Sequence, residues 1–476
     1  NLNIQYSTSS NNPRFDNLTE YSGSKLKFAE WYYGPQKRLL ISPQLKINPD
    51  KKLLESGSIT LAYQNIKESR VQRKFSSLDG YYRDENVDVF SLNGDFFVPL
   101  TKDETRIFSY GAELTYNNVD SEAKGKTLDV YNNTVIGFTD EFTIQSRYPE
   151  GGSTYTSAAA YINYRQDISK KSTLNTGVRF VSTHLTSKWI DTTFITLPDM
   201  DISLNNSAVT ATVGYIFKPT VDWQLNCIIS SGFRSPNIDD IGKIREQNGE
   251  VTVPNIYLKP EYAYNFETTI LKYFNNKQFQ AGLNVYYTLL HNYITRDYFE
   301  LNGSPTIIYD GDEALTMANV NKDNAFIAGG TFSFKGNLTP NWLTDGSITY
   351  TQGEAYDTKD HLSSIPPLFG TLGTGYQKNR FQAGIKWLFN GKKTIDKYNL
   401  VEGIDNVEQT PYNASLNEYY GNPSWNIFNL NANYKLNKNF SFFVNFDNIF
   451  DIHYKEFASS ISASGRNFSA AFLINI

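Results

Sequence analysis

This sequence has one cysteine and lacks long apolar runs and an excess of charge. The single cysteine, Cys227, excludes an intramolecular disulfide and a cysteine metal cluster, and we expect it to act as a small apolar residue. No segment approaches the run of about 18 apolar residues that a membrane-spanning helix requires. The net charge is only -5 over 476 residues, so the sequence shows no basic footprint for nucleic acid.

The sequence also lacks the domain boundaries expected of an ordinary soluble protein of this length. A single soluble core usually stops growing at about 250–300 residues, yet residues 1–476 show no linker, no shift in composition and no charged tail. We therefore expect one domain over the whole chain. The chain begins at Asn1 without a methionine or a signal peptide, so we expect a mature or truncated protein.

Aromatic residues are abundant although overall hydrophobicity is low. Hydrophobic residues make up 40% of the chain and aromatics 15%, with 33 Tyr and 32 Phe, and the mean hydropathy is -0.45. In a membrane-spanning β-barrel only every second residue of a strand faces lipid. Low hydropathy with many aromatics is therefore compatible with a spanning barrel and incompatible with a helical membrane protein.

Apolar and polar residues alternate with period two in several segments. Residues 279–287, 381–387 and 428–434 show this alternation. The last segment shows it most clearly, with one face formed by Phe468, Ala470, Phe472, Ile474 and Ile476. The pattern predicts β-strands with one apolar side, but alternation alone does not separate a soluble sandwich from a barrel in lipid.

Short and long connections between the predicted strands alternate strictly, which favours the barrel. Short polar turns are expected near residues 48–54, 100–105, 168–172, 218–222, 275–277, 336–341, 377–380 and 435–439. Longer connections are expected at 10–37, 76–84, 117–156, 190–204, 235–262, 289–322, 356–366, 388–427 and 452–465. Bacterial barrels have this layout, with short periplasmic turns and longer external loops.

Eight short turns join sixteen strands, and the segments 1–9 and 466–476 bring the total to eighteen. A β-propeller would show a repeated signature of about 40–50 residues, whereas these hairpins are irregularly spaced. We therefore predict an all-β fold, a transmembrane antiparallel up-and-down β-barrel with about 18 visible strands.

Two linked motifs resemble a known family. GFRSPNIDD (232–240) and VPNIYLKPE (253–261) resemble the paired boxes of TonB-dependent outer-membrane receptors, with Ser235 in place of the usual Ala. The resemblance extends to NVNKDNAFIAGGTFSF (319–334), to NFDNIFDIHY (445–454) and, near the start, to PRFDNLTEYSGSKLKFAEWYYGPQKRLL (13–40), so it covers essentially the whole chain.

The resemblance implies a 22-stranded barrel with a plugged lumen. Residues 1–476 would then be the barrel domain without the N-terminal plug and without the first four strands. It further implies an integral protein in the outer membrane of a Gram-negative bacterium, energised through TonB and an inner-membrane complex by way of the missing N-terminal region. Whether a surface lipoprotein caps the barrel is left open.

The function implied is active uptake of a scarce, bulky nutrient, above all a ferric siderophore or similar metal chelate. A passive porin or binding barrel is the alternative, which a constricting loop folded into the lumen would support. An outer-membrane hydrolase is the third hypothesis. No Gly-x-Ser-x-Gly elbow precedes a helix, so we expect no catalytic residues, no enzyme activity and no cofactor.

Ligand-binding candidates are aromatic residues of the outer loops and one arginine. Stacked rings could hold a flat ligand, although the same residue types also serve loop packing and the interfacial girdle. Arg234 is the polar candidate, for an anionic ligand or for the plug, with a structural role in the motif as the alternative. The aromatic candidates are Trp31, Tyr32, Tyr33, Tyr81, Tyr82, Tyr412, Tyr419, Tyr420 and Trp425.

Metal and haem sites are disfavoured. The resemblance implies that a haem receptor would carry a histidine between the two boxes, but residues 237–253 contain none. The histidines of the chain are His184, His291, His361 and His453. The acidic group Asp310, Asp312 and Glu313 lacks the spacing of an EF-hand loop, so we expect a solvated loop there.

Overall fold

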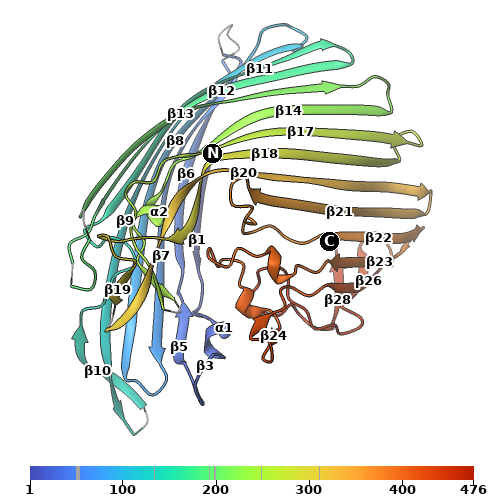
Figure 1. The fold of residues 1–476 in the computed structure, drawn as a ribbon. Helices are drawn as coiled ribbons and strands as arrows, with labels where there is room; N and C mark the ends of the chain where they lie inside the picture. The colour runs from blue at the N-terminus through green and yellow to red at the C-terminus, as the bar shows by residue number, and fades with distance from the viewer. Residues whose placement is uncertain are drawn as a thin grey trace.

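Antiparallel strands form one large curved sheet that wraps around a central space (Figure 1). The computed structural model describes residues 1–49, 54–132, 134–191, 193–197, 200–247, 249–309 and 311–475. No helix in this part of the chain is long and apolar enough to cross a membrane. The predicted turn at residues 48–54 lies largely outside the described residues, as do Asp310 and Ile476.

Eighteen strands of the described residues make up the sheet wall, as the sequence predicted, and each pairs antiparallel with its neighbour along the wall. The first nine are β1 (Leu2–Thr8), β6 (Lys37–Ile47), β7 (Ser56–Lys74), β8 (Asp79–Pro99), β9 (Arg106–Tyr131), β11 (Ser153–Ser169), β12 (Ser172–Lys188), β13 (Asp201–Phe217) and β14 (Trp223–Arg234). The second nine are β17 (Glu261–Phe274), β18 (Phe279–Tyr298), β20 (Asp312–Thr339), β21 (Trp342–Ala355), β22 (Phe369–Lys378), β23 (Phe381–Asn390), β26 (Trp425–Lys435), β27 (Phe440–Asp447) and β28 (Asn467–Ile474).

Short elements occupy the long connections, which gather at one end of the sheet (Figure 1). We call this the loop end, and tight turns such as 170–171 and 340–341 form the opposite end. The short elements are β2 (Asn12–Pro13), α1 (Phe15–Leu18), β3 (Tyr21–Ser22), β4 (Lys25–Leu26), β5 (Phe28–Tyr33), β10 (Thr134–Phe142), α2 (Ile238–Ile241), β15 (Arg245–Gln247), β16 (Glu250–Thr252), β19 (Thr306–Tyr309), η1 (Ile395–Lys397), η2 (Val407–Gln409), β24 (Tyr412–Asn413) and β25 (Glu418–Tyr419).

Several expected loops are partly strand, among them 289–322, where β18 continues to Tyr298 and β20 begins at Asp312. The ladder between β8 and β9 runs from Asp79 opposite Thr127 to Pro99 opposite Ile107. Most of residues 76–84 and 117–131 are therefore paired, and the expectation of long loops there was wrong. The 26 residues of β9, at about 3.3 Å each, far exceed an apolar band about 25 Å tall. Their polar composition reflects extension beyond that band.

One side of the wall is an apolar surface of the kind that faces lipid. Ile385, Leu430, Phe446 and Phe468 lie opposite one another across β23, β26, β27 and β28. On β18, Leu283 and Val285 are 44% and 43% exposed, as expected of residues without a protein neighbour on that side. We call this the outward side; the other side lines the lumen.

The apolar band ends before the strands do. On β8, the outward Phe90 and Leu92 belong to the band, whereas Asp84, Asn86 and Asp88 occupy the outward positions that precede them. Charged side chains are costly in hydrocarbon, so the part of β8 before Phe90 lies beyond the membrane-spanning segment. The loop end is therefore the polar, external end of the wall.

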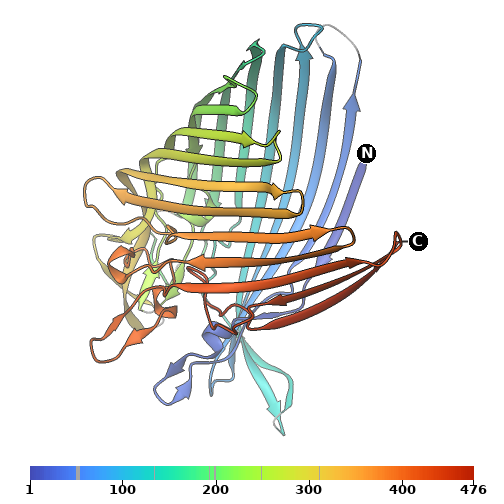
Figure 2. The same ribbon diagram turned by 90° about the vertical axis from the view of Figure 1, so that its right-hand side faces the viewer.

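The wall has two free margins within the described residues. There, β1 pairs only with β6, and β28 pairs only with β27. Figure 2 shows these two strands along the open side of the sheet, on which both chain ends lie. Leu2 and Ile4 are 63% and 61% exposed, and the unpaired backbone of β1 is an edge of the type that strands normally pair or protect.

Candidate functional site

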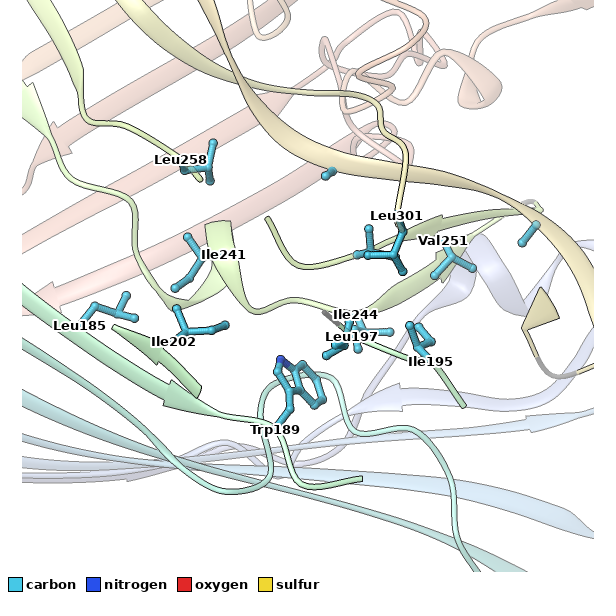
Figure 3. Packing of buried hydrophobic residues seen from close by; sticks show 13 residues of the cluster. Leu185, Trp189, Ile195, Leu197, Ile202, Ile241, Ile244, Val251, Leu258 and Leu301 are labelled. Atoms are coloured by element: carbon cyan, nitrogen blue, oxygen red, sulfur yellow. The ribbon is translucent and has the colours of Figure 1, made fainter. Parts of the chain in front are cut away.

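Three long loops pack a hydrophobic core against the inner side of the wall (Figure 3). This loop core joins residues of segments 189–202, 241–258 and 301–318, with Trp189 and Ile241 at 1% and 0% exposed. It rests on Leu185 of β12, which is an odd number of positions from the outward Phe180 and therefore points into the lumen. The loops are thus held over the lumen rather than extended into solvent.

The first motif forms the helical turn at which the chain enters the loop core. Helix α2 begins after Asn237, whose side chain and that of Asp240 form a reciprocal capping box. The Arg234 guanidinium lies 2.5 Å from the Asp240 carboxylate and 3.8 Å from that of Glu261 at the start of β17. Arg234 therefore ties the first motif to the end of the second, which is a structural role.

The second and third motifs interlock through amide side chains. The Asn255 Nδ2 donates to the backbone oxygen of Asn319 at 2.8 Å, and the Asn319 Nδ2 donates to the backbone oxygen of Asp240 at 3.2 Å. The Asn321 side chain accepts from the Lys259 backbone N–H at 2.7 Å and donates to its backbone oxygen at 2.9 Å. The motifs therefore fasten one loop to the neighbouring strands.

A cavity of about 270 Å³ opens between the inner wall and the outer loops. Its cationic lining residues are Arg70, Lys74, Arg83, Arg147 and Arg245, and its aromatic ones are Trp31, Tyr81, Phe142, Phe194 and Tyr309. Glu246 is the one carboxylate among its lining residues within the described chain. We call this cavity the basic pocket.

The register of β5, β7 and β8 explains which side chains enter the basic pocket. Trp31 pairs with Gln72, and Gln72 with Tyr81, so these residues share the lumenal side. One position away on each strand, Tyr32, Val71 and Tyr82 lie opposite one another. Their side chains point to the outward side, as that of Phe90 does. The next inward row contains Tyr33, Arg70 and Arg83.

Among the described residues, two of the arginines form no ion pair with a carboxylate; Arg83 is half-buried and Arg245 is exposed. Burial lowers the pKa of Arg83 and of Arg245, and the neighbouring Arg147 adds to both effects by repulsion. The Arg83 Nε donates to the backbone oxygen of Gln145 at 3.2 Å. A cation that is partly removed from water without a counter-charge is stabilised when an anion joins it.

The carboxylates beside the pocket neutralise only part of this charge. Arg70 lies 2.7 Å from Glu68 and 4.0 Å from Glu85. Glu85 is 8% exposed, and burial raises its pKa. Neither of its carboxylate oxygens has a hydrogen-bond donor among the described residues. The basic pocket therefore keeps an excess of positive charge.

Aromatic rings give the basic pocket flat surfaces. The guanidinium of Arg14 lies over the rings of Trp31 and Tyr33, at 5.0 and 5.4 Å from their centroids, and is itself held by Asp16 at 2.5 Å. Tyr81 and Phe142 meet edge to face at 6.0 Å. Guanidinium groups beside ring faces can bind an anionic ligand that also contains a flat ring.

A lumenal pocket beneath external loops, inside a wall of this size, is the arrangement of a receptor barrel. The family model described as "TonB dependent receptor-like, beta-barrel" matches residues 1–449. The chain belongs to the TonB-dependent receptors. This family consists of outer-membrane proteins of Gram-negative bacteria that transport and bind ligands and are not enzymes, so the hydrolase hypothesis is excluded.

Solved structures of other TonB-dependent receptors share the fold at low identity. The copper transporter OprC matches with a TM-score of 0.72 and 17% identity, covering 93% of this chain and 66% of its own. The ferripyoverdine receptor of Pseudomonas aeruginosa, bound to ferripyoverdine, matches with a TM-score of 0.67 and 15% identity, covering 99% and 62%. This chain thus spans about two thirds of their length or less.

A curated relative matches a shorter part of the receptor. The hemoglobin and hemoglobin-haptoglobin-binding protein of Haemophilus ducreyi is 25% identical over 228 residues. The match covers 43% of this chain and 23% of that protein.

The structure brings together some of the ligand-binding candidates and separates others. Trp31 and Tyr81 line the basic pocket, and Tyr33 contacts the guanidinium of Arg70 at 5.4 Å. Tyr32 and Tyr82 face outward, Trp425 lines another cavity, and Tyr419 and Tyr420 lie in the β24–β25 hairpin region with Tyr412. A ligand role for any of them stays a prediction.

Sequence reasoning missed the arginines of the basic pocket. Arg70 and Arg83 lie on inward positions of β7 and β8, so strand alternation could have found them. Arg147 and Arg245 lie in separate loops, and no local pattern brings them together. His184 and His291 lie at outward positions of β12 and β18, hydrogen-bonded to Asn205 and Asn324.

Proposed function

We propose that this receptor takes up a scarce, bulky nutrient across the outer membrane by TonB-dependent transport, and that the nutrient is a ferric siderophore or similar metal chelate. The basic pocket is the observation that carries this proposal. It combines four guanidinium groups with flat rings, in the lumen, beneath the external loops. Hard metal ions are chelated by oxygen donors, and chelates built from anionic oxygens carry the charge that this pocket lacks.

Receptors with a similar fold are named for siderophores, which supports a ferric chelate as the ligand class but does not identify the ligand. They include the siderophore receptor PiuA from Acinetobacter baumannii and the ferripyoverdine receptor of Pseudomonas aeruginosa. The relative named for binding hemoglobin makes haem the competing cargo. His184 and His291 face outward. His361 lies in the 356–366 connection, and His453 lines another cavity. None of the four histidines lines the basic pocket, so we favour the chelate.

We also propose that the complete protein closes the barrel with four further strands and carries a plug ahead of them. The free margins at β1 and β28 support this, because unpaired strand edges are not tolerated in hydrocarbon. Transport would then be driven by TonB and the inner-membrane complex acting on the upstream region. An integral location in the outer membrane follows from the same reasoning.

A passive porin or binding barrel is the second candidate, and the loop core favours it. That cluster folds over the lumen, as a constricting loop would. A passive route would operate without energy, whereas TonB-dependent uptake requires the proton-motive force.

The decisive experiment compares uptake of radiolabelled iron, presented as anionic ferric chelates, in cells that express or lack the intact gene. The proposal expects uptake that depends on the gene and stops when TonB is deleted or an uncoupler is added. Uptake that continues in the uncoupled cells would establish the passive route. Gene-dependent growth on hemoglobin, without uptake of any chelate, would replace the proposed cargo with haem.

A further inference from the structure

A second cavity of about 310 Å³ lies at the loop end, between the β23–β26 connection and the β27–β28 connection. None of its lining residues lines the basic pocket. Trp425, at the start of β26, and Tyr454 both line it; their ring centroids are 4.6 Å apart and the planes are inclined by 47°. Pro411, Pro423 and Ala458 extend the apolar lining. We call it the aromatic cavity.

The indole N–H of Trp425 is buried beside the aromatic cavity. The indole Nε1 of Trp425 has no hydrogen-bond acceptor in the part of the chain that the structure describes. Indole N–H groups usually find a partner when buried, but this one is covered by protein atoms, so the cavity offers a ligand the ring faces of Trp425 and Tyr454 and not the N–H. The rim carries donors and acceptors on Asn406, Gln409, Thr410, Ser424, Glu456 and Ser459.

The aromatic cavity differs from the basic pocket in charge. Lys455 donates to the backbone oxygen of Gln409 at 3.0 Å and stands beside Glu456, so the charges on the rim are balanced. Asp405 also lines the cavity, but its carboxylate lies 3.1 Å from the Lys393 ammonium, and these side chains are 2% and 4% exposed. No excess charge is left to select an anion.

The same ion pair holds the aromatic cavity in shape. The Lys393 ammonium donates to the backbone oxygen of Ile365 at 2.8 Å and lies 4.3 Å from the ring centroid of Phe457. Asp405 accepts from the Ser364 backbone N–H at 2.8 Å. Three external connections therefore meet at one buried pair, and the two that form the cavity are pre-organised by it.

We propose that the aromatic cavity binds one neutral sugar ring. A pyranose presents an apolar face of C–H groups to aromatic rings and a rim of hydroxyls that donate and accept hydrogen bonds. The cavity offers the matching surfaces: two inclined rings and a polar rim whose charges are balanced. Its volume is at the lower end of the range of about 300–1,000 Å³ for small-ligand sites, which suits one ring. This site goes beyond the proposed uptake of a chelate and does not depend on it.

The test measures saturation-transfer NMR from the intact receptor in nanodiscs to methyl glucoside, methyl galactoside and methyl mannoside. Cyclohexanol, which has the ring without the hydroxyl pattern, and a methyl glucuronide, which adds a charge, are measured beside them. The proposal expects transfer to at least one neutral pyranoside, with weaker transfer to both comparison compounds. Transfer to none of the pyranosides, or equal transfer to cyclohexanol, would overturn it.

Variants locate the binding. Trp425→Phe keeps a ring but reduces the aromatic face, so affinity should fall about three- to tenfold, and Trp425→Ala should abolish transfer. Trp387→Phe is the matched control, because Trp387 lies on the adjacent β23 and does not line the aromatic cavity; its indole donates to Asn426. If Trp425→Ala misfolds, the Trp425→Phe result decides alone; unchanged affinity in a folded Trp425→Phe receptor contradicts the proposal.

The sugar could diffuse freely or belong to a glycan of the membrane surface. Competition by the core oligosaccharide of lipopolysaccharide, added to the same NMR sample, distinguishes the sources. Competition assigns the cavity to the surface glycan, and its absence assigns it to a free sugar. Ferric chelate binding in the basic pocket is measured separately, so failure of one proposal leaves the other intact.

Discussion

Replacing Arg83 by methionine should separate ligand binding from folding. Arg83→Met removes a half-buried guanidinium that has no carboxylate partner among the described residues, and it keeps a side chain of similar length. Losing the hydrogen bond to Gln145 costs about 0.5–1.5 kcal/mol, and relief of an unpaired, half-buried charge is worth about the same. The free energy of unfolding should therefore stay within about 1 kcal/mol of wild type or rise.

Binding of an anionic ligand should respond in the opposite direction. A hydrogen bond from a guanidinium to a charged acceptor contributes about 1.5–3 kcal/mol. At 1.4 kcal/mol for each factor of ten, Arg83→Met should weaken binding of an anionic chelate by about 10- to 150-fold. The expected signature is a receptor that is as stable as wild type and binds poorly.

Equilibrium dialysis of a ferric tris-catecholate complex against the purified receptor measures the affinity, and urea unfolding in detergent micelles measures the stability. Arg38→Met is the control, because Arg38 lies on β6 outside the basic pocket, where its guanidinium donates to Gln64. Wild-type affinity in Arg83→Met would refute the assignment of the pocket. A loss of more than about 2 kcal/mol in stability would refute the claim that Arg83 is unpaired.

Three further predictions use other contacts of the loops. Arg234→Met removes the cationic partner of the buried Asp240 carboxylate, so the free energy of unfolding should fall by about 1–3 kcal/mol. Unchanged resistance to urea and to protease would contradict the structural role. Although burial alone would raise the pKa of Asp16, its arginine partner brings it below the ordinary value. The stability that this ion pair contributes is present above the ordinary carboxylate pKa of about 4 and is lost as pH falls through the lowered pKa of Asp16. Proteolysis of the first loop should therefore increase in acid, and Asp16→Asn should remove this pH dependence. Trp31→Ala should weaken chelate binding at least about threefold, because it removes a ring face from the basic pocket. Tyr32→Ala should not weaken it, because the Tyr32 side chain faces outward. Equal losses of affinity in equilibrium dialysis would contradict the register of β5 and β7.

The wall could be predicted from the sequence because its signal is local. Period-two alternation needs only the strand itself, and Phe468, Phe472 and Ile474 show it without reference to any neighbour. Counting turns then yields the number of strands, which the structure confirms. The prediction of long loops failed at residues 79–84 and 117–131, because strand that extends beyond lipid carries polar residues on both sides and resembles a loop.

The basic pocket could be predicted only in part. Aromatic loop residues at 31–33 and 81–82 were recognised, but the alternation that places Trp31 and Tyr81 inside and Tyr32 and Tyr82 outside depends on the register between β5, β7 and β8. Arg147 and Arg245 approach the pocket because the loop core folds over the lumen, which depends on contacts between distant segments. No spacing in the sequence encodes that approach.

Arg234 and Arg83 show why the prominent arginine was the less informative one. Arg234 lies in a recognisable motif, and its charge is satisfied by Asp240 and Glu261, which is the condition of a residue that holds a fold together. Arg83 lies in no motif, and its half-buried guanidinium lies near Arg147 and forms no ion pair with a carboxylate of the described residues. Proteins tolerate such local conflict chiefly where a function resolves it, so an arginine without a counter-charge points to a ligand more strongly than a satisfied one in a motif. In this receptor the motif builds the loop core, and the unpaired guanidinium groups beside it mark where the anion should bind.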